Sequence, residues 1–277
     1  MSSFLPTVLL DQGDHLNISA TAKHALGTRG VTVDGRVFRY SRAGEALAAG
    51  RLAFAKAPTE LQFGTNCPLT TDQAAGIAVS STSLKLSSTW SAFSGETGTT
   101  GIVADYFKEG YFVVSGTTGG QIVRIKGNST ASTGTASQNI EVYFEYNDKL
   151  AAALTTANEV FLAHNQYDRI TMNLGQAIAG ETSIPVGVTP KAVTSLYYFW
   201  LQTWGPVPVF CGTATTLGLM ATGSTEAATT GGVSLYALNA SATGLDLLGA
   251  IRRPPIGNVL VAGAALEYSL IDLHISP

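Results

Sequence analysis

The segment Ser195–Met220 reads SLYYFWLQTWGPVPVFCGTATTLGLM and holds the densest aromatic run in the chain. Side chains alternate between the two faces of a β-strand. One predicted face carries Tyr198, Trp200, Gln202 and Trp204. The other carries Tyr197, Phe199, Leu201 and Thr203. A strand with one face in water alternates polar with apolar residues, whereas both of these faces are large and apolar. The segment therefore predicts a strand at the centre of a β domain, covered by protein on both faces.

Two further questions about this strand are where it ends and what covers its second face. Gly205-Pro206 is expected to break the run, and Pro208 restricts the following piece to an edge or a bulge. One face can belong simply to the core of the chain. It can also meet another subunit, because aromatic residues are enriched in protein interfaces. The candidate subunit interface consists of Tyr197, Phe199, Trp200, Trp204 and Phe210.

Composition limits the classes of protein that the chain can belong to. Charged residues make up 13% of the 277 residues, about half of the roughly 25% usual in soluble domains. Hydrophobic residues make up 45%, which is too apolar for a disordered chain. A net charge of −3, with dispersed basic residues, argues against nucleic-acid binding. Low charge in an ordered protein indicates a surface that is partly buried in an assembly.

The order of patterns along the chain predicts an all-β fold, a β-sandwich or barrel-like domain preceded by a smaller β-rich N-terminal region. Short strands recur about every eight to twelve residues, and no convincing helix exceeds about ten residues. Asp34-Gly35 predicts a β-hairpin turn. The turn-rich segment Ser94–Gly101 predicts a boundary between residues 1–95 and residues 96–277. In the last strand, Ala264–Ile275, the apolar parity changes and predicts a bulge near Leu270.

The first ten residues, MSSFLPTVLL, form an apolar terminus. They lack the basic region of a signal peptide, and no apolar run in the chain is long enough for a transmembrane helix. Such a terminus either packs into its own domain or extends to a neighbour as an arm. Exposed apolar surface costs roughly 25 cal/mol per Å², so we expect a partner or another subunit to bury it. The candidate arm contacts are Phe4, Leu5, Val8, Leu9 and Leu10.

No strong catalytic or metal-binding motif is present in the sequence. The four histidines are scattered singly, and neither Cys67 nor Cys211 belongs to a C-x-x-C pair. Two free buried thiols are expected, although a disulfide stays open. Asp11 and Asp14 lack the further carboxylates of a recognisable calcium loop. The sequence therefore predicts a protein that is not an enzyme and has no cofactor or metal.

Four carboxylates lie on predicted neighbouring strands and keep one enzymatic alternative open. They are Asp105, Glu109, Glu141 and Glu145. A pair of such groups can hydrolyse glycosidic bonds. Solvated strand faces and turn residues are the preferred explanation.

Four blocks of the sequence resemble capsid decoration, or cement, proteins of tailed bacteriophages. They are DGRVFRYSRAGEALAAGRLAF (Asp34–Phe54), ADYFKEGYFVVSGTTGGQIVRIKGN (Ala104–Asn128), SIPVGVTP (Ser183–Pro190) and YYFWLQTWGPVPVFCG (Tyr197–Gly212). The resemblance implies a virion protein, made in the host cytoplasm, that sits on the outer surface of an icosahedral head and bridges major capsid subunits. It further implies a homo-oligomer, with a trimer favoured over a dimer, no nucleic-acid or membrane partner, and capsid contacts within residues 1–95.

Two other classes of function stay open beside this one. A virion fibre, spike or carbohydrate-binding β module would share the low charge and the β-rich pattern, and exposed Trp90, Trp200 or Trp204 would favour it. A hydrolase on a β fold would require a cleft with paired carboxylates.

Overall fold

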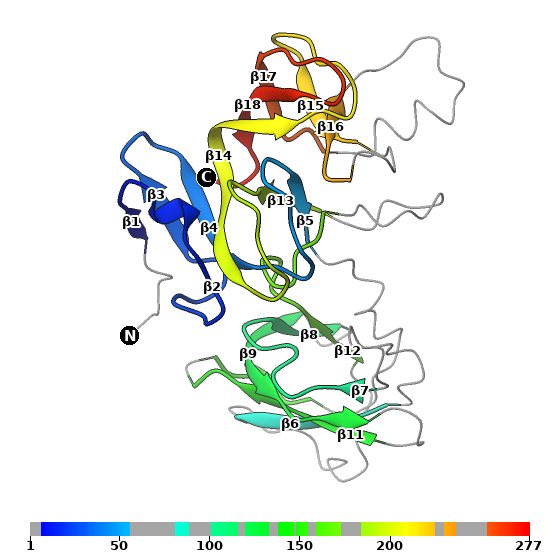
Figure 1. The fold of residues 1–277 in the computed structure, drawn as a ribbon. Helices are drawn as coiled ribbons and strands as arrows, with labels where there is room; N and C mark the ends of the chain where they lie inside the picture. Colours follow the sequence, from blue (N-terminus) through cyan, green and yellow to red (C-terminus); the bar gives the residue numbers. More distant parts are fainter. Residues whose placement is uncertain are drawn as a thin grey trace, which may run out of the picture. The chain divides into compact units, whose positions relative to one another are not determined.

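The computed structural model describes residues 7–55, 81–88, 101–115, 120–132, 138–146, 148–154, 159–172, 184–224, 230–236 and 254–277. These residues form β-strands joined by turns, with a single short 3₁₀ helix, η1 (Asp14–Leu16), among them. The predicted all-β fold is confirmed (Figure 1). Within the described segments, no helix has the length and hydropathy needed to cross a membrane.

The chain divides into two compact units, but the division differs from the predicted one. Unit 1 combines Ser3–Ala57 with Gln166–Pro277, and unit 2 is the intervening segment Pro58–Asn165. The predicted boundary at residues 94–101 falls inside unit 2. Strands from the two ends of the chain pair with each other in unit 1. Local sequence patterns do not indicate pairing between segments so far apart in the chain. Blue, yellow and red strands consequently share one sheet in Figure 1.

Unit 1 is built on a sheet of eleven strands with the order β1-β3-β4-β14-β18-β17-β15-β16, to which β2, β13 and β5 are joined. The strands from the first part of the chain are β1 (Val8–Leu10), β2 (Ile18–Ser19), β3 (Arg29–Thr32), β4 (Val37–Arg42) and β5 (Leu52–Phe54). Those from the second part are β13 (Pro185–Val188), β14 (Tyr198–Phe210), β15 (Met220–Gly223), β16 (Val233–Leu235), β17 (Gly257–Val261) and β18 (Tyr268–His274). All the pairs are antiparallel except β1 with β3.

Strand β14 is the centre of this sheet, and it continues through the predicted break at Gly205-Pro206. Its first half pairs with β4 and its second half with β18, and the register shifts between Gln202 and Trp204. Pro206 and Pro208 stand two residues apart, so their missing N–H groups fall on one edge of the strand. The Phe210 N–H, which has the same parity, donates to the Gly50 carbonyl at 2.8 Å and not to β18. The prolines therefore remove no donor from the ladder with β18.

The two faces of β14 alternate as predicted, and the chain itself covers both faces of the first half of the strand, whereas Pro206 and Pro208 in the second half are exposed. Phe199 and Leu201 pack into a cluster with Ile170 and Val193. Trp200, on the opposite face, packs into a separate cluster. Other segments of unit 1 therefore cover the second face of this part of β14, for which the sequence allowed either the chain's own core or another subunit.

Two further predictions concern turns and bulges. The turn at Asp34-Gly35 joins β3 to β4 as predicted; Gly35 has φ 84°, a conformation that glycine adopts without strain. Strand β18 keeps one regular alternation, with Ser269, Ile271 and Leu273 buried, so the predicted parity change within it is wrong. The irregularity lies on the neighbouring β17, where the register shifts between Val259 and Val261.

Unit 2 contains an antiparallel sheet with the order β12-β8-β9-β11-β6 and a small pair, β10 with β7. Its strands are β6 (Ser83–Ser88), β7 (Gly101–Ile102), β8 (Tyr111–Ser115), β9 (Gln121–Asn128), β10 (Ala131–Ser132), β11 (Gln138–Phe144) and β12 (Glu159–Ala163). Its core is a single cluster that includes Phe107, Phe112 and Ile140, all fully buried. This cluster shares no residue with the clusters of unit 1, so each unit has its own core.

Candidate functional site

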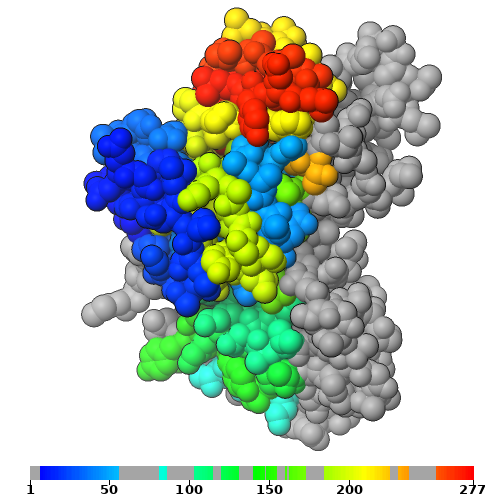
Figure 2. Space-filling model, viewed as in Figure 1, coloured from blue at the N-terminus to red at the C-terminus, as the bar shows by residue number. Residues whose placement is uncertain are grey.

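The structure brings part of the predicted arm together with the predicted central strand. Leu10 of β1 and Trp200 of β14 belong to one buried cluster with Phe38 and Tyr40, and Val8 packs against it. In Figure 2 the blue N-terminal segment lies directly beside the yellow-green segment that includes β14. Leu10 is only 3% exposed, so the chain itself buries this residue and no partner is needed. That corrects the expectation for Leu10.

The other arm residues have different surroundings. Val8 is half-buried, whereas Leu9 points away from the cluster and is 69% exposed. Strand β1 pairs with β3 and lies at the end of the sheet, so Leu9 is displayed on an edge strand. Phe4 and Leu5 lie outside the described residues. Among the described arm residues, Leu9 is therefore the one that stays available to a partner.

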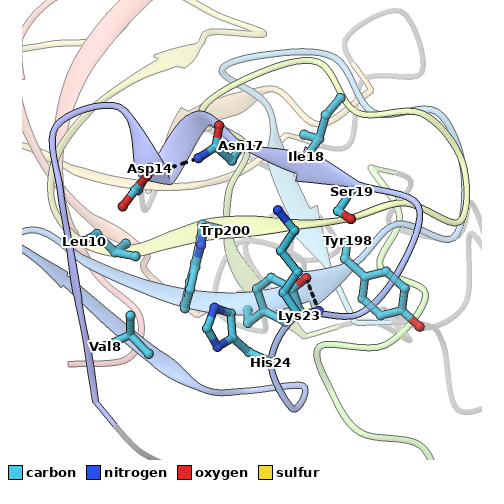
Figure 3. A pocket seen from close by; sticks show the side chains of 11 residues that line it. Val8, Leu10, Asp14, Asn17, Ile18, Ser19, Lys23, His24, Tyr198 and Trp200 are labelled. Atoms are coloured by element: carbon cyan, nitrogen blue, oxygen red, sulfur yellow. Dashed lines mark hydrogen bonds between the residues drawn. The ribbon is translucent and has the colours of Figure 1, made fainter.

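An aromatic pocket of about 180 Å³ lies between the segment 8–24 and β14 (Figure 3). The His24 ring lies 5.3 Å from that of Trp200 and meets the Tyr40 ring edge-on at 5.1 Å. The Lys23 backbone N–H donates to the Tyr40 hydroxyl at 3.0 Å. Burial raises the pKa of Tyr40 above its ordinary value, so the hydroxyl stays protonated at neutral pH.

The mouth of this aromatic pocket is polar. The Asn17 amide donates to the Asp14 carboxylate at 3.1 Å, and the Asp11 backbone N–H donates to the same carboxylate at 3.2 Å. Asp14 thus closes the turn around η1. Trp200 is 4% exposed and Tyr40 3%, so these rings offer little free surface, and the pocket has room for one small group of a ligand.

A second feature of unit 1 is an exposed sheet face at the far half of β14. Directly paired residues share a face in an antiparallel ladder, and Phe210 is paired with Tyr268 and Pro208 with Leu270. Val261 of β17 is paired with Leu270. In the neighbouring row, Met220 of β15 is paired with Asn258, which is paired with Asp272. We call the set Met220, Pro208, Phe210, Val261, Tyr268 and Leu270 the apolar face. Figure 2 shows these strands in yellow and red gathered on one part of the surface.

The apolar face is open to solvent. Tyr268 is 54% exposed, Val261 55% and Met220 50%. Leu266, on the loop before β18, is 63% exposed and adds to the apolar surface. Two charged groups adjoin it: Asp272 lies on the same face of β18, two residues beyond Leu270, and the Arg51 guanidinium carbon lies 3.5 Å from the centre of the Phe210 ring. Contiguous exposed apolar surface of this kind marks a site of protein–protein contact.

The predicted subunit-interface residues separate into two groups. Phe199 is 2% exposed and Trp200 4%, so the fold of the chain itself uses both and neither is available to another subunit. Tyr197 is half-buried against the cluster that contains Phe199. Trp204 and Phe210 are half-buried on the same side of β14 as the apolar face, and Trp204 lies 4.8 Å from His274. The exposed partners Tyr268 and Val261 were not among the predicted interface residues, because the pairing of β14 with β18 and of β18 with β17 brings them together and no local sequence pattern indicates that pairing.

The remaining candidate groups are distributed as follows. Cys211 is buried, and its Sγ lies 3.0 Å from the Ser269 hydroxyl; Cys67 lies outside the described residues, as does Trp90. Of the predicted carboxylates, Asp105, Glu109 and Glu145 line one groove of unit 2. Within the described residues, no group of three or more acidic, histidine or cysteine side chains is arranged to hold a metal ion.

No protein-family model, no curated protein and no solved structure matches the chain.

Proposed function

We propose that this protein is a structural component of a tailed-phage head, a decoration protein that binds the outer surface of the shell and bridges neighbouring major capsid subunits. The resemblance of four sequence blocks to such proteins supports this role. The low content of charged residues, 13%, agrees with a surface that is covered in an assembly.

The apolar face is the observation that carries the proposal. Tyr268 is 54% exposed beside the half-buried Phe210. Exposure of its apolar ring to water is unfavourable, so covering the sheet with another protein lowers the free energy. Aromatic residues are enriched among those that dominate binding energy. The face lies on paired strands, so little conformational entropy remains to be lost when a partner docks.

We assign the apolar face to contact with further copies of the chain and the β1 edge to contact with the shell. Two of the predicted interface residues, Trp204 and Phe210, lie on the side of β14 that carries the apolar face. Repeating one contact around a symmetry axis uses a single sequence feature several times. A trimer is favoured over a dimer on the resemblance, and several weak shell contacts in one oligomer add up to firm attachment.

Light scattering on the purified protein tests the oligomer. A mass near 28.8 kDa at micromolar concentration would show a monomer and would remove the assigned role of the apolar face. If an oligomer forms, Tyr268→Ser is expected to dissociate it, because this exposed ring would lie inside the contact. The matched control is Tyr111→Ser in unit 2, where the ring is 39% exposed and lies outside the apolar face.

Co-sedimentation with phage heads that lack this protein tests the shell contact. Leu9→Ser is expected to weaken binding without lowering the melting temperature, because Leu9 is exposed on β1. Leu10→Ser, in contrast, is expected to destabilise unit 1. Heads that do not take up the wild-type protein would contradict the proposal as a whole.

A further inference from the structure

Unit 2 carries a groove of about 670 Å³, a size in the range of roughly 300–1,000 Å³ typical of small-molecule sites. Its hollow shape has a cause in the backbone. Gly127 of β9 is paired with Tyr143 of β11, and Phe144 is paired with Ile125, so Lys126 is an extra residue at a bulge. A Cβ at position 127 would collide with the Asp105 carboxylate. Glycine therefore keeps the floor of the groove open and lets this carboxylate lie against the strand.

One wall of the groove comes from a tight turn before β8 in which the backbone is strained. Asp105 has φ 60° and Glu109 φ 61°, both in the left-handed region that residues other than glycine rarely adopt. The turn is held by the Glu109 N–H, which donates to the Ile125 carbonyl at 2.9 Å, and by the Asp105 N–H, which donates to the Asn128 carbonyl at 3.0 Å. Strain of this kind concentrates at functional sites. Here its effect is to hold two acidic side chains in the groove.

Two tyrosines provide the aromatic surface of the groove. Tyr146 is 81% exposed and Tyr143 is 38% exposed. The Tyr143 hydroxyl donates to the Glu141 carboxylate at 3.3 Å, which holds the ring in place on the sheet. A tyrosine ring combines an apolar face with a polar edge, so it can pack against C–H groups while neighbouring atoms bind hydroxyls.

Charged groups of both signs line the groove, and four of them are available to a ligand. They are Asp105, Lys108, Lys126 and Glu145. None of the four side chains makes a hydrogen bond or ion pair with another residue in the described part of the chain. Carboxylates only accept hydrogen bonds and ammonium groups only donate them, so together they satisfy a ligand that does both. A saccharide hydroxyl does both, and its ring offers C–H faces to the tyrosines.

We propose that this groove of unit 2 binds a saccharide. A strongly basic peptide fits less well, because Lys108 and Lys126 would repel it, and an acidic ligand would meet Asp105 and Glu145. Binding without cleavage is expected. Asp105 is exposed and Glu109 lies 3.8 Å from Arg124, so neither has the apolar shielding that a glycosidic general acid needs. The inference is independent of the apolar face and of the role in a phage head.

Calorimetric titration of the full chain tests this site, with linear pentasaccharides of glucose, mannose and N-acetylglucosamine as probes. We expect at least one probe to bind with a dissociation constant below about 1 mM. Tyr146→Ala and Tyr143→Ala are each expected to weaken that binding about tenfold or more, as the loss of a central aromatic contact does. The control is Tyr111→Ala, whose ring is 39% exposed, close to the 38% of Tyr143, and lies outside the groove. This control is expected to bind the saccharide like the wild type.

Three results would overturn the saccharide site. One is a lack of binding by every probe up to about 10 mM. Another is binding that Tyr146→Ala and Tyr143→Ala leave unchanged. The third is binding of a Lys- and Arg-rich hexapeptide that Tyr146→Ala abolishes while no saccharide binds, which would make the groove a peptide site. Oligomer mass and shell binding are expected to be normal in Tyr146→Ala, so a failure here is separate from a failure of the proposed function.

Discussion

Leu10 and Trp200 meet over Gly30. A Cβ at position 30 would lie 2.7 Å from Leu10 Cδ1 and 2.8 Å from Trp200 Cζ3, so the missing side chain of Gly30 is what allows the contact. The first strand of the chain and its central strand are thereby joined in one cluster. The N-terminal segment from Val8 is for this reason part of unit 1.

Gly30→Ala is expected to destabilise unit 1 by about 1–3 kcal/mol, because it inserts a methyl group into a space that two side chains already fill. Urea unfolding measures the change. Gly120→Ala is the matched control, since its Cβ would have only the Val114 carbonyl nearby, at 3.9 Å. Equal effects of the two substitutions would show that Leu10 does not pack against Trp200 in solution.

Trp200→Ala is expected to cost about 3–5 kcal/mol of stability, the usual range for removing a large buried aromatic side chain. The half-buried Trp204, truncated in the same way, is expected to cost clearly less. Thermal and urea unfolding compare the two variants, and light scattering reports the oligomer. If the Trp200→Ala protein were stable but no longer formed the oligomer, Trp200 would belong to the subunit interface and not to the core.

Asp168 is a buried carboxylate between two arginines. It lies 3.8 Å from Arg42 and 3.7 Å from Arg169, and its side chain is 6% exposed. Asp168→Asn is expected to cost about 3–5 kcal/mol, because the positive charges lose their compensation in a buried site.

The matched control for Asp168 is Asp34→Asn. Asp34 pairs with Arg36 at 2.8 Å but is 57% exposed, so its loss is expected to cost at most about 1 kcal/mol. Chemical denaturation of both variants gives the comparison. A cost for Asp168→Asn no larger than that for Asp34→Asn would contradict the buried ion pair.

His15 makes the stability of unit 1 depend on pH. Burial first, and the nearby Arg36 charge second, lower the pKa of His15 below its ordinary value of 6.5. The unfolded chain therefore binds more protons below pH 6.5, so stability is complete above that pH and falls as the pH drops through the lowered pKa of the folded state.

The check on His15 is the urea midpoint at pH 5.5 and at pH 7.5, measured for the wild type and for His15→Gln. The wild type is expected to lose more stability on acidification than the variant does, since Gln carries no proton-linked charge. Identical pH dependence in the two proteins would exclude a contribution from His15. The imidazole ring also packs 5.2 Å from Phe38, so His15→Gln is expected to be less stable than the wild type at both pH values.

Local patterns in the sequence were sufficient for the class of fold and for several of its parts. The alternation of large apolar residues predicted the two covered faces in the first half of β14, with Phe199 on one and Trp200 on the other. Asp34-Gly35 predicted the hairpin between β3 and β4. These features depend on side-chain direction and on turn conformation, which neighbouring residues determine.

Tertiary structure alone decided which segments share a sheet and which apolar residues stay exposed. Two ends of the chain form unit 1 because β14 pairs with β4 on one side and β18 on the other, and the intervening segment forms a core of its own. Leu9 and Leu10 look alike in sequence, yet one is 69% exposed and the other 3%. Adjacent residues of a strand point to opposite faces, and whether a face is covered depends on distant segments. Burial at each position is therefore a property of the assembled sheet, which no short stretch of the sequence contains.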